Sequence, residues 1–190
     1  MVIRFCSRLD IQSIVRIHLQ SFNDFFLSSL GEGFLKTYYR AYLDTPGAIL
    51  ICAEEGGGVI GFAAATVYSR GFNRKLLLRH PLIFAFHTMV MLFSKPKALA
   101  RLVRNFVKTS SSVSDNRDYA ELFSLAVSPE HQRKGFGRAL VYSLERILVE
   151  EGRLTLSLTT DSENNASSLF FYNNCFYNSC YVFLTFFRFY

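Results

Sequence analysis

The spacing of apolar residues predicts alternating strands and helices in the first third of the chain. Val2 to Phe5 is predicted to be a short strand, and Asp10 is predicted to cap the helix that follows it. Two helices are predicted by apolar residues at near-helical spacing: Ile11, Ile14, Val15, Ile17 and Leu19, and then Phe34, Leu35, Tyr38, Tyr39 and Tyr42. Two apolar runs, 48–53 and 59–67, are joined by residues 54–58 and predict a β-hairpin.

The pattern changes after residue 69. Residues 82–93 are apolar on nearly every face, but the run is too short and too interrupted to span a bilayer. The segment KPKALARLVRNFVK, residues 95–108, predicts a helix with one apolar and one basic side. The apolar side holds Leu99, Leu102, Val103, Phe106 and Val107, and the basic side holds Lys97, Arg101, Arg104 and Lys108.

The last third returns to strands and helices. An apolar-rich strand, 119–127, stops at Ser128 and Pro129, and Leu140, Leu144, Ile147 and Leu148 predict a helix that ends near Gly152. Residues 154–160 alternate as a strand, and helical spacing follows at Ala166, Leu169 and Phe170. Residues 180–190 are aromatic and strand-like without a clear turn, which predicts either one long strand or a hairpin completed by another subunit.

Composition narrows the class of protein. The chain has 190 residues, of which 50% are hydrophobic and 16% aromatic, so we predict one globular domain, 1–190, rather than a disordered chain. The four cysteines, Cys6, Cys52, Cys175 and Cys180, have no zinc-type spacing, and the N-terminus does not resemble a signal peptide. We therefore predict a cytoplasmic protein with free thiols and no metal site.

The positive charge is local. The formal net charge is +6, and the excess of Lys and Arg over Asp and Glu comes from residues 56–114, which contain no Asp or Glu. This charge indicates an anionic acceptor or neighbour for a basic helical insertion at about 69–118. The segment 75–108, which includes the basic amphipathic helix, also predicts peripheral contact with the inner face of a membrane. The alternative is a pair of helices packed on the domain with a solvated basic face. Nucleic acid is disfavoured as a partner because the segment has neither a recognised module nor a groove of exposed aromatic residues.

A glycine-containing loop lies between the strand 119–127 and the helix that follows. The sequence LAVSPEHQRKGFGRAL, residues 125–140, can expose consecutive backbone N–H groups at the start of the helix, and those groups attract an anion such as a phosphate. The loop matches neither of the common nucleotide-binding fingerprints. Its pattern Q-x-x-G-x-G after V-x-P resembles the pyrophosphate loop of the GNAT superfamily of N-acyltransferases.

A second motif extends the resemblance. The family's later signature aligns with Asn165, Ser168, Phe171, Tyr172, Phe176 and Tyr177. Ser168 replaces a small alanine, and Phe176 stands where the family usually has glycine. The resemblance covers the chain from the strand at Glu121 to Tyr177, and it implies an α/β fold. That fold has a mixed, mostly antiparallel sheet of six or seven strands, splayed in the middle, with helices on both faces.

The resemblance also implies roles for individual residues. Backbone groups of Leu125, Ala126 and Val127 would hold the pantetheine arm of acetyl-CoA, and Asn165 would contact the same arm. The pyrophosphate loop would consist of Gln132, Arg133, Lys134, Gly135, Phe136, Gly137 and Arg138. Glu121 would be the general base and Tyr172 the proton donor, since an alkylammonium must lose a proton before it attacks a thioester. Thr160 stands where many members of the family have a glutamate, and Asp161 is a second candidate for the base.

The sequence thus predicts an acyl-CoA-dependent N-acyltransferase that moves an acetyl or other short acyl group to a primary amine, most simply of a small molecule, by direct attack within a ternary complex. An alternative remains open, in which a non-catalytic CoA-binding domain of the same fold uses its basic helices to bind anionic lipid or another macromolecule. The insertion 69–118 is expected to shape the acceptor side, because loops on a rigid scaffold commonly determine specificity. A homodimer is compatible with either reading.

Overall fold

The structure is a computed structural model, and it describes residues 1–22, 26–81, 84–86, 89, 119–161 and 181–187. The sequence predictions for most of 82–118, for Asn165 and Tyr172, and for Cys175 and Cys180 lie outside these residues.

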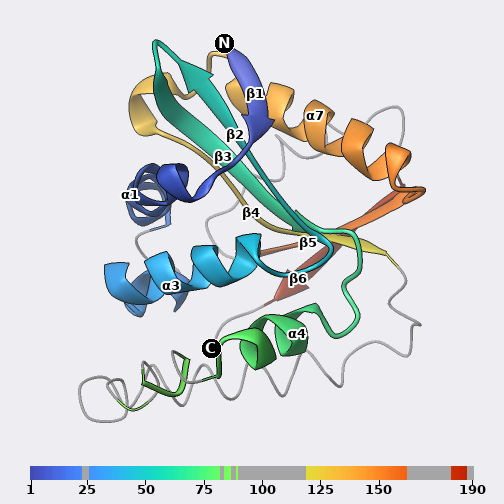
Figure 1. Ribbon diagram of the computed structural model, residues 1–190. Coiled ribbons are helices and arrows are strands. Elements are labelled where there is room, and N and C mark those ends of the chain that lie inside the picture. The colour runs from blue at the N-terminus through green and yellow to red at the C-terminus, as the bar shows by residue number, and fades with distance from the viewer. Residues whose placement is uncertain (23–25, 82–83, 87–88, 90–118, 162–180, 188–190) are drawn as a thin grey trace.

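The described strands form one mixed sheet of six strands in the order in which they occur along the chain (Figure 1). They are β1 (Val2–Phe5), β2 (Ala48–Glu55), β3 (Gly58–Thr66), β4 (Ala120–Val127), β5 (Thr155–Asp161) and β6 (Tyr181–Phe187). The pairs from β1 to β4 are antiparallel, whereas β5 pairs in parallel with both β4 and β6. The predicted hairpin is confirmed as β2 and β3. The full strand count stays a prediction, because 162–180 and 188–190 lie outside the described residues.

Helices cover both faces of the sheet (Figure 1). They are α1 (Ile11–Ser21), α2 (Phe26–Ser29), α3 (Glu32–Leu43), α4 (Phe72–Arg79) and α7 (Phe136–Glu150). Alternation along the strands divides the core in two: Leu50 and Cys52 of β2 face α1 and α3, while Ile49 and Ile51 face α7. The α/β architecture with helices on both faces is therefore confirmed.

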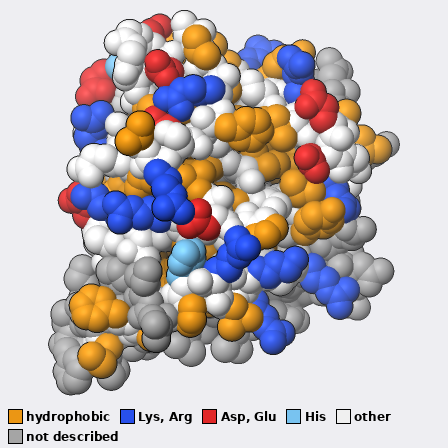
Figure 2. All heavy atoms as spheres, viewed as in Figure 1, with side chains coloured by type: hydrophobic (Ala, Val, Ile, Leu, Met, Phe, Trp, Pro, Cys, Tyr) orange, Lys and Arg blue, Asp and Glu red, His pale blue; other side chains and the backbone are white. Residues whose placement is uncertain are grey.

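The described part of the basic insertion includes α4. Phe72 and Leu76 bury one side of this helix in the core shared with α1 and α3, because they lie four residues apart on one helical face. Arg74, Lys75 and Arg79 remain exposed. Figure 2 shows that Lys and Arg side chains gather on the surface over this helix and beside it.

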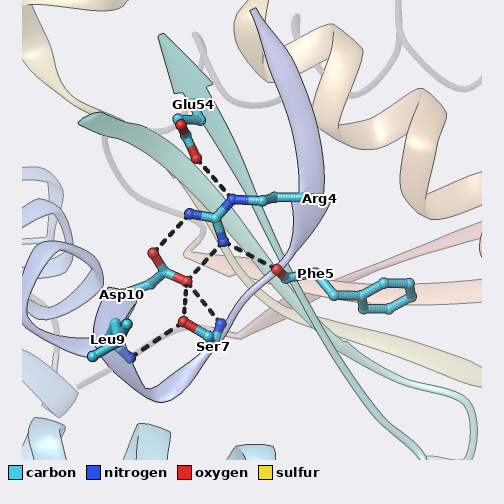
Figure 3. Close-up of polar contacts among 6 residues, drawn as sticks. All are labelled: Arg4, Phe5, Ser7, Leu9, Asp10 and Glu54. Atoms are coloured by element: carbon cyan, nitrogen blue, oxygen red, sulfur yellow. Dashed lines mark hydrogen bonds and ion pairs between the residues drawn. The ribbon is translucent and has the colours of Figure 1, made fainter. Parts of the chain in front are cut away.

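Asp10 has a different role from the predicted cap. Its side chain makes no capping hydrogen bond to α1. It instead accepts two hydrogen bonds from the Arg4 guanidinium, at 2.8 and 2.9 Å, and one from the backbone N–H of Ser7 at 2.7 Å (Figure 3). Arg4 also donates to Glu54 at 2.7 Å, so the network ties β1 to β2 and to the start of α1. The guanidinium beside Asp10 holds the pKa of that carboxyl well below its usual range.

Candidate active site

β4 pairs with its two neighbours over different lengths. Its register with β3 extends from Glu121 to Val127, but its register with β5 includes only Ala120, Glu121 and Leu122. Beyond Leu122 the two parallel strands diverge, as Figure 1 shows. The second half of β4 therefore has an edge that β5 does not pair with.

The backbone groups on that edge can be assigned from the register. Ser128 donates its N–H to Ile60 of β3 at 2.8 Å, and consecutive residues of a strand direct their backbone groups to alternate edges. The backbone groups of Val127 and Leu125 therefore face the edge away from β3. Ala126 faces β3, where a Cβ on Gly61 would lie 2.9 Å from its carbonyl oxygen. Of the three predicted contacts on this strand, only Leu125 and Val127 offer backbone groups to the open edge.

The loop that follows is fastened to the end of β4. Gln132 donates from Nε2 to the carbonyl of Val127 at 3.0 Å, so this predicted loop residue holds the loop in place. Arg133 has a φ of 62°, in the left-handed region that side-chain-bearing residues seldom adopt. Gly135 has a φ of 87°, and a Cβ there would meet no atom within 4 Å. Backbone conformation rather than lack of space therefore requires glycine at 135.

The loop delivers the chain to an uncapped helix. Gly135 is the N-cap of α7, and as a glycine it has no side chain that could cap the first N–H groups of the helix. Those groups have no partner within the helix, and the helix dipole adds partial positive charge at the same point. Arg133, Lys134 and Arg138 are exposed around it, while Phe136 packs its ring into the core beneath the loop. Such an arrangement attracts an anion.

Glu121 lies on the face of the sheet that α3 covers, opposite to the face that α7 covers. It precedes a β-bulge at Phe123, since Leu122 pairs with Ala65 but Ser124 pairs with Ala64. Leu122 and Leu125 pack in the core that contains α7, whereas Phe123 packs in the core that contains α3. Glu121 is half-buried and accepts a hydrogen bond from Oγ of Ser69 at 2.6 Å.

Two tyrosines of α3 lie near this carboxylate. Burial raises the pKa of Tyr38 and of Tyr42, and the negative charge of Glu121 raises both further. Tyr42 also contacts Phe123 of β4, with 6.3 Å between ring centroids. Near neutral pH both phenols are uncharged, so these two aromatic neighbours of the Glu121 carboxylate are neutral.

Two residues beside Glu121 were not found as site candidates from the sequence. Ser69 and Tyr38 were not candidates, because a lone serine after a strand and an aromatic residue on a helix face carry no motif. Asn165 and Tyr172 lie outside the described residues, and so do the side chains of Thr160 and Asp161. Within the described ranges, no group of His, Cys, Asp and Glu is arranged to hold a metal ion. None of the helices described here is long and apolar enough to cross a membrane.

Solved structures with this fold include several N-acetyltransferases. The aminoglycoside 6'-N-acetyltransferase of Acinetobacter haemolyticus matches with a TM-score of 0.58 at 12% identity, over 99% of this chain and 98% of that chain. The aminoglycoside N-acetyltransferase AAC(6')-Iy, solved with CoA, matches with a TM-score of 0.62 at 14% identity, over 98% of this chain and 93% of that chain. The ribosomal-protein-S18-alanine N-acetyltransferase of Escherichia coli matches with a TM-score of 0.55 at 19% identity, over 90% of this chain and 74% of that chain.

These identities are low, so the structural matches establish the fold alone. No curated protein matches the sequence. The family model described as Acetyltransferase (GNAT) family, however, matches residues 16–176, which include β4, the loop and α7. The chain therefore belongs to the GNAT family of acetyltransferases.

Proposed function

We propose that this protein transfers the acetyl group of acetyl-CoA to a primary amine of a small molecule, by direct attack within a ternary complex. The observation that carries the proposal is the divergence of β4 from β5 after Leu122, beside the uncapped N-terminus of α7. An extended thiol-bearing arm can bind along the open strand edge while its diphosphate lies at the start of the helix.

The residues present fit such a coenzyme. The backbone N–H and carbonyl of Leu125 and the N–H of Val127 face the open edge and would bind the amides of the pantetheine arm. The N–H groups at the start of α7 would bind the pyrophosphate, with Arg133, Lys134 and Arg138 supplying positive charge around it. Two of the related structures, AAC(6')-Iy and the PaiA N-acetyltransferase of Thermoplasma acidophilum, contain CoA. Asn165 is proposed as a further contact to the arm.

Glu121 is proposed as the general base. Acetyl-CoA supplies an activated thioester, but an alkylammonium has no lone pair until it loses a proton. The Glu121 carboxylate is half-buried at the point where β4 and β5 separate, and it would take that proton directly or through one water molecule. Tyr172 is proposed to donate a proton to the departing thiolate. Tyr172→Phe is then expected to lower turnover while coenzyme affinity stays nearly unchanged.

Thermal unfolding with and without acetyl-CoA tests coenzyme binding. A ligand that binds only the native state raises the midpoint, by an amount that grows with the logarithm of its concentration. Mass spectrometry of a panel of primary amines incubated with labelled acetyl-CoA then tests transfer. An unchanged midpoint would contradict every coenzyme-dependent function. A shifted midpoint without any acetylated amine would favour the non-catalytic alternative.

Exposed apolar residues near α4 support the alternative function, a non-catalytic domain that binds anionic lipid. Leu78, Phe86 and Met89 are 63%, 60% and 58% exposed, and they lie in the segment that carries the basic surface of α4. Exposed apolar side chains among cations are typical of surfaces that lie on anionic lipid, so this face would bring the cytoplasmic protein to the inner side of a membrane. The same charge could attract an anionic acceptor. Co-sedimentation with phosphatidylserine vesicles at low salt separates the two, because only the membrane surface predicts binding to vesicles.

A further inference from the structure

Ser69 connects the loop after β3 to the start of β4 by two hydrogen bonds. Its backbone N–H donates to the carbonyl of Tyr119 at 3.0 Å, and its hydroxyl donates to Oε2 of Glu121 at 2.6 Å. The first bond fixes the serine backbone relative to β4, so the second holds the carboxylate from a fixed point. Ser69 is half-buried, which limits competition from water for its hydroxyl.

The surroundings of the pair restrict where the carboxylate can point. Thr66 lies directly opposite Glu121 in the register of β3 and β4, but its hydroxyl donates to the carbonyls of Gly47 and Tyr68, at 3.0 and 3.1 Å. Among the described residues, Tyr38 and Tyr42 on α3 lie close enough for the charge of Glu121 to act on them, and burial keeps both phenols neutral. The bulge residue Phe123 has no titratable group. The hydrogen bond from Ser69 therefore orients Glu121 between neutral aromatic neighbours.

We propose that Ser69 is a positioning residue for Glu121, and that its hydroxyl holds the carboxylate ionised and aimed at a cationic primary amine with an apolar or aromatic body. This inference rests on the proposed function, in which Glu121 is the base. In the proton transfer, a nitrogen–hydrogen bond of the ammonium breaks, the proton moves to the Glu121 carboxylate, and the freed lone pair attacks the thioester. The serine hydroxyl keeps its own proton throughout.

The physical reason for this proposal is that a hydrogen-bond donor binds an ionised carboxylate more strongly than a protonated carboxylic acid. A hydrogen bond to a carboxylate stabilises it relative to the carboxylic acid and lowers its pKa. Removal of the hydroxyl takes away that preference and also frees the Glu121 side chain to adopt other rotamers. From the typical strength of charge-assisted hydrogen bonds, the pKa of Glu121 is expected to rise by roughly one unit in Ser69→Ala.

The deciding experiment is a carbon-13 NMR titration of the Glu121 carboxyl in protein labelled at glutamate, with Glu121→Gln to assign the signal. Ser69→Ala is expected to raise the apparent pKa of that signal by about one unit, and Ser69→Thr, which keeps the hydroxyl, is expected to restore it. Ser69→Cys, whose thiol is a weak donor, is expected to give an intermediate value. An unchanged pKa in the alanine and cysteine variants would overturn the inference.

Thr66→Val is the matched control. It removes the hydroxyl opposite Glu121 that bonds to backbone carbonyls, so it is expected to lower the melting temperature without moving the pKa of Glu121. An equal pKa shift in this control would overturn the inference too, because a general loosening of the sheet would then explain both variants.

Activity separates this inference from the proposed function. With acetyl-CoA and 2-phenylethylamine as the probe pair, the acid limb of kcat/KM is expected to move with the NMR pKa in the Ser69 variants. If the NMR pKa shifts but Glu121→Gln turns over the probe as fast as the natural chain, the role of Glu121 as base fails while the Ser69 contact stands. A shift in the NMR pKa without a shift of the acid limb would show that Ser69 does not position the base.

Discussion

The two faces of β4 carry different chemistry, and the proposed reaction would use both. On the α7 side, the loop 128–138 offers backbone N–H groups and exposed cations at a helix N-terminus. On the α3 side, Glu121 accepts a hydrogen bond from the hydroxyl of Ser69 and lies near tyrosines of α3, which come from distant parts of the chain. Backbone groups need only the right dihedral angles, which glycine permits, whereas a side-chain site needs the packing of several elements.

The bulge at Phe123 changes which face of the sheet the following residues of β4 occupy. Without the extra residue, strict alternation would place Glu121, Phe123 and Leu125 on one face. With it, Phe123 packs toward α3 and Leu125 toward α7. A bulge thus lets the residues before and after it serve different faces of the same strand.

The largest effect is expected when the loop is given a negative charge. Gly135→Glu forces a side-chain-bearing residue to a φ of 87° and places a carboxylate beside the proposed pyrophosphate site. Coenzyme affinity is expected to fall at least about 1000-fold, which corresponds to ~4 kcal/mol. Isothermal titration calorimetry with CoA measures this.

Gly152→Glu is the control for that variant. Gly152 lies just beyond the C-terminal end of α7, has a φ of 71° and also has open space around it, so the substitution adds the same charge and similar backbone strain. Both variants are expected to lower the melting temperature, but only Gly135→Glu should lose CoA. Equal affinities in the two variants would refute the loop assignment.

On the other face, Glu121→Gln is expected to reduce turnover by about 100-fold, which is typical for the loss of a general base. Coenzyme affinity should stay the same, because Glu121 faces α3 rather than the loop. Steady-state kinetics on an amine from the panel, with calorimetry for CoA, checks both values. A loss of CoA affinity equal to the loss of turnover would mean that the two faces are not independent.

The α1 and α3 side should also respond to acid. His18 is 2% exposed on α1, and its Nδ1 lies 2.8 Å from the hydroxyl of Tyr39. Burial lowers the pKa of His18 to about 4, below the ordinary value of about 6.5 expected in the unfolded chain. Because the folded pKa is the lower one, the unfolded state binds more protons between these values, and stability present above pH 6.5 is lost as the pH falls toward 4.

Between pH 7 and pH 5 this histidine alone should cost about 2 kcal/mol of unfolding free energy. Urea unfolding at the two pH values measures the loss, and His18→Phe should flatten the difference. A wild-type pH dependence that persists unchanged in His18→Phe would assign the sensitivity to other groups.

The smallest effect is expected from Arg133→Gly. Glycine accepts the φ of 62° at this position without strain, so the melting temperature should not fall. The loss of one exposed cation should weaken CoA binding about threefold to fivefold, or ~1 kcal/mol, and should reduce its dependence on salt. An affinity that is unchanged at low salt would show that Arg133 does not face the coenzyme.

Much of the fold followed from local patterns. The hairpin predicted from 48–53 and 59–67 is present as Ala48–Glu55 and Gly58–Thr66, and the loop before α7 was located from its glycines. These features are local, because strand periodicity and positive φ angles depend on neighbouring residues in the chain. Asp10 shows the limit of such reasoning, since Arg4 on the neighbouring strand β1 and the N–H of Ser7 bind the carboxylate that was expected to cap α1.

The sequence by itself determined that this chain alternates helices and strands, and it predicted a backbone anion site between β4 and α7. Only the tertiary structure decided which face Glu121 occupies and that Ser69 lies 2.6 Å from it, 52 residues away along the chain. The reason is that a bulge and a contact between distant segments arise from strand register and packing. Neither leaves a periodic signal in the residues that form it.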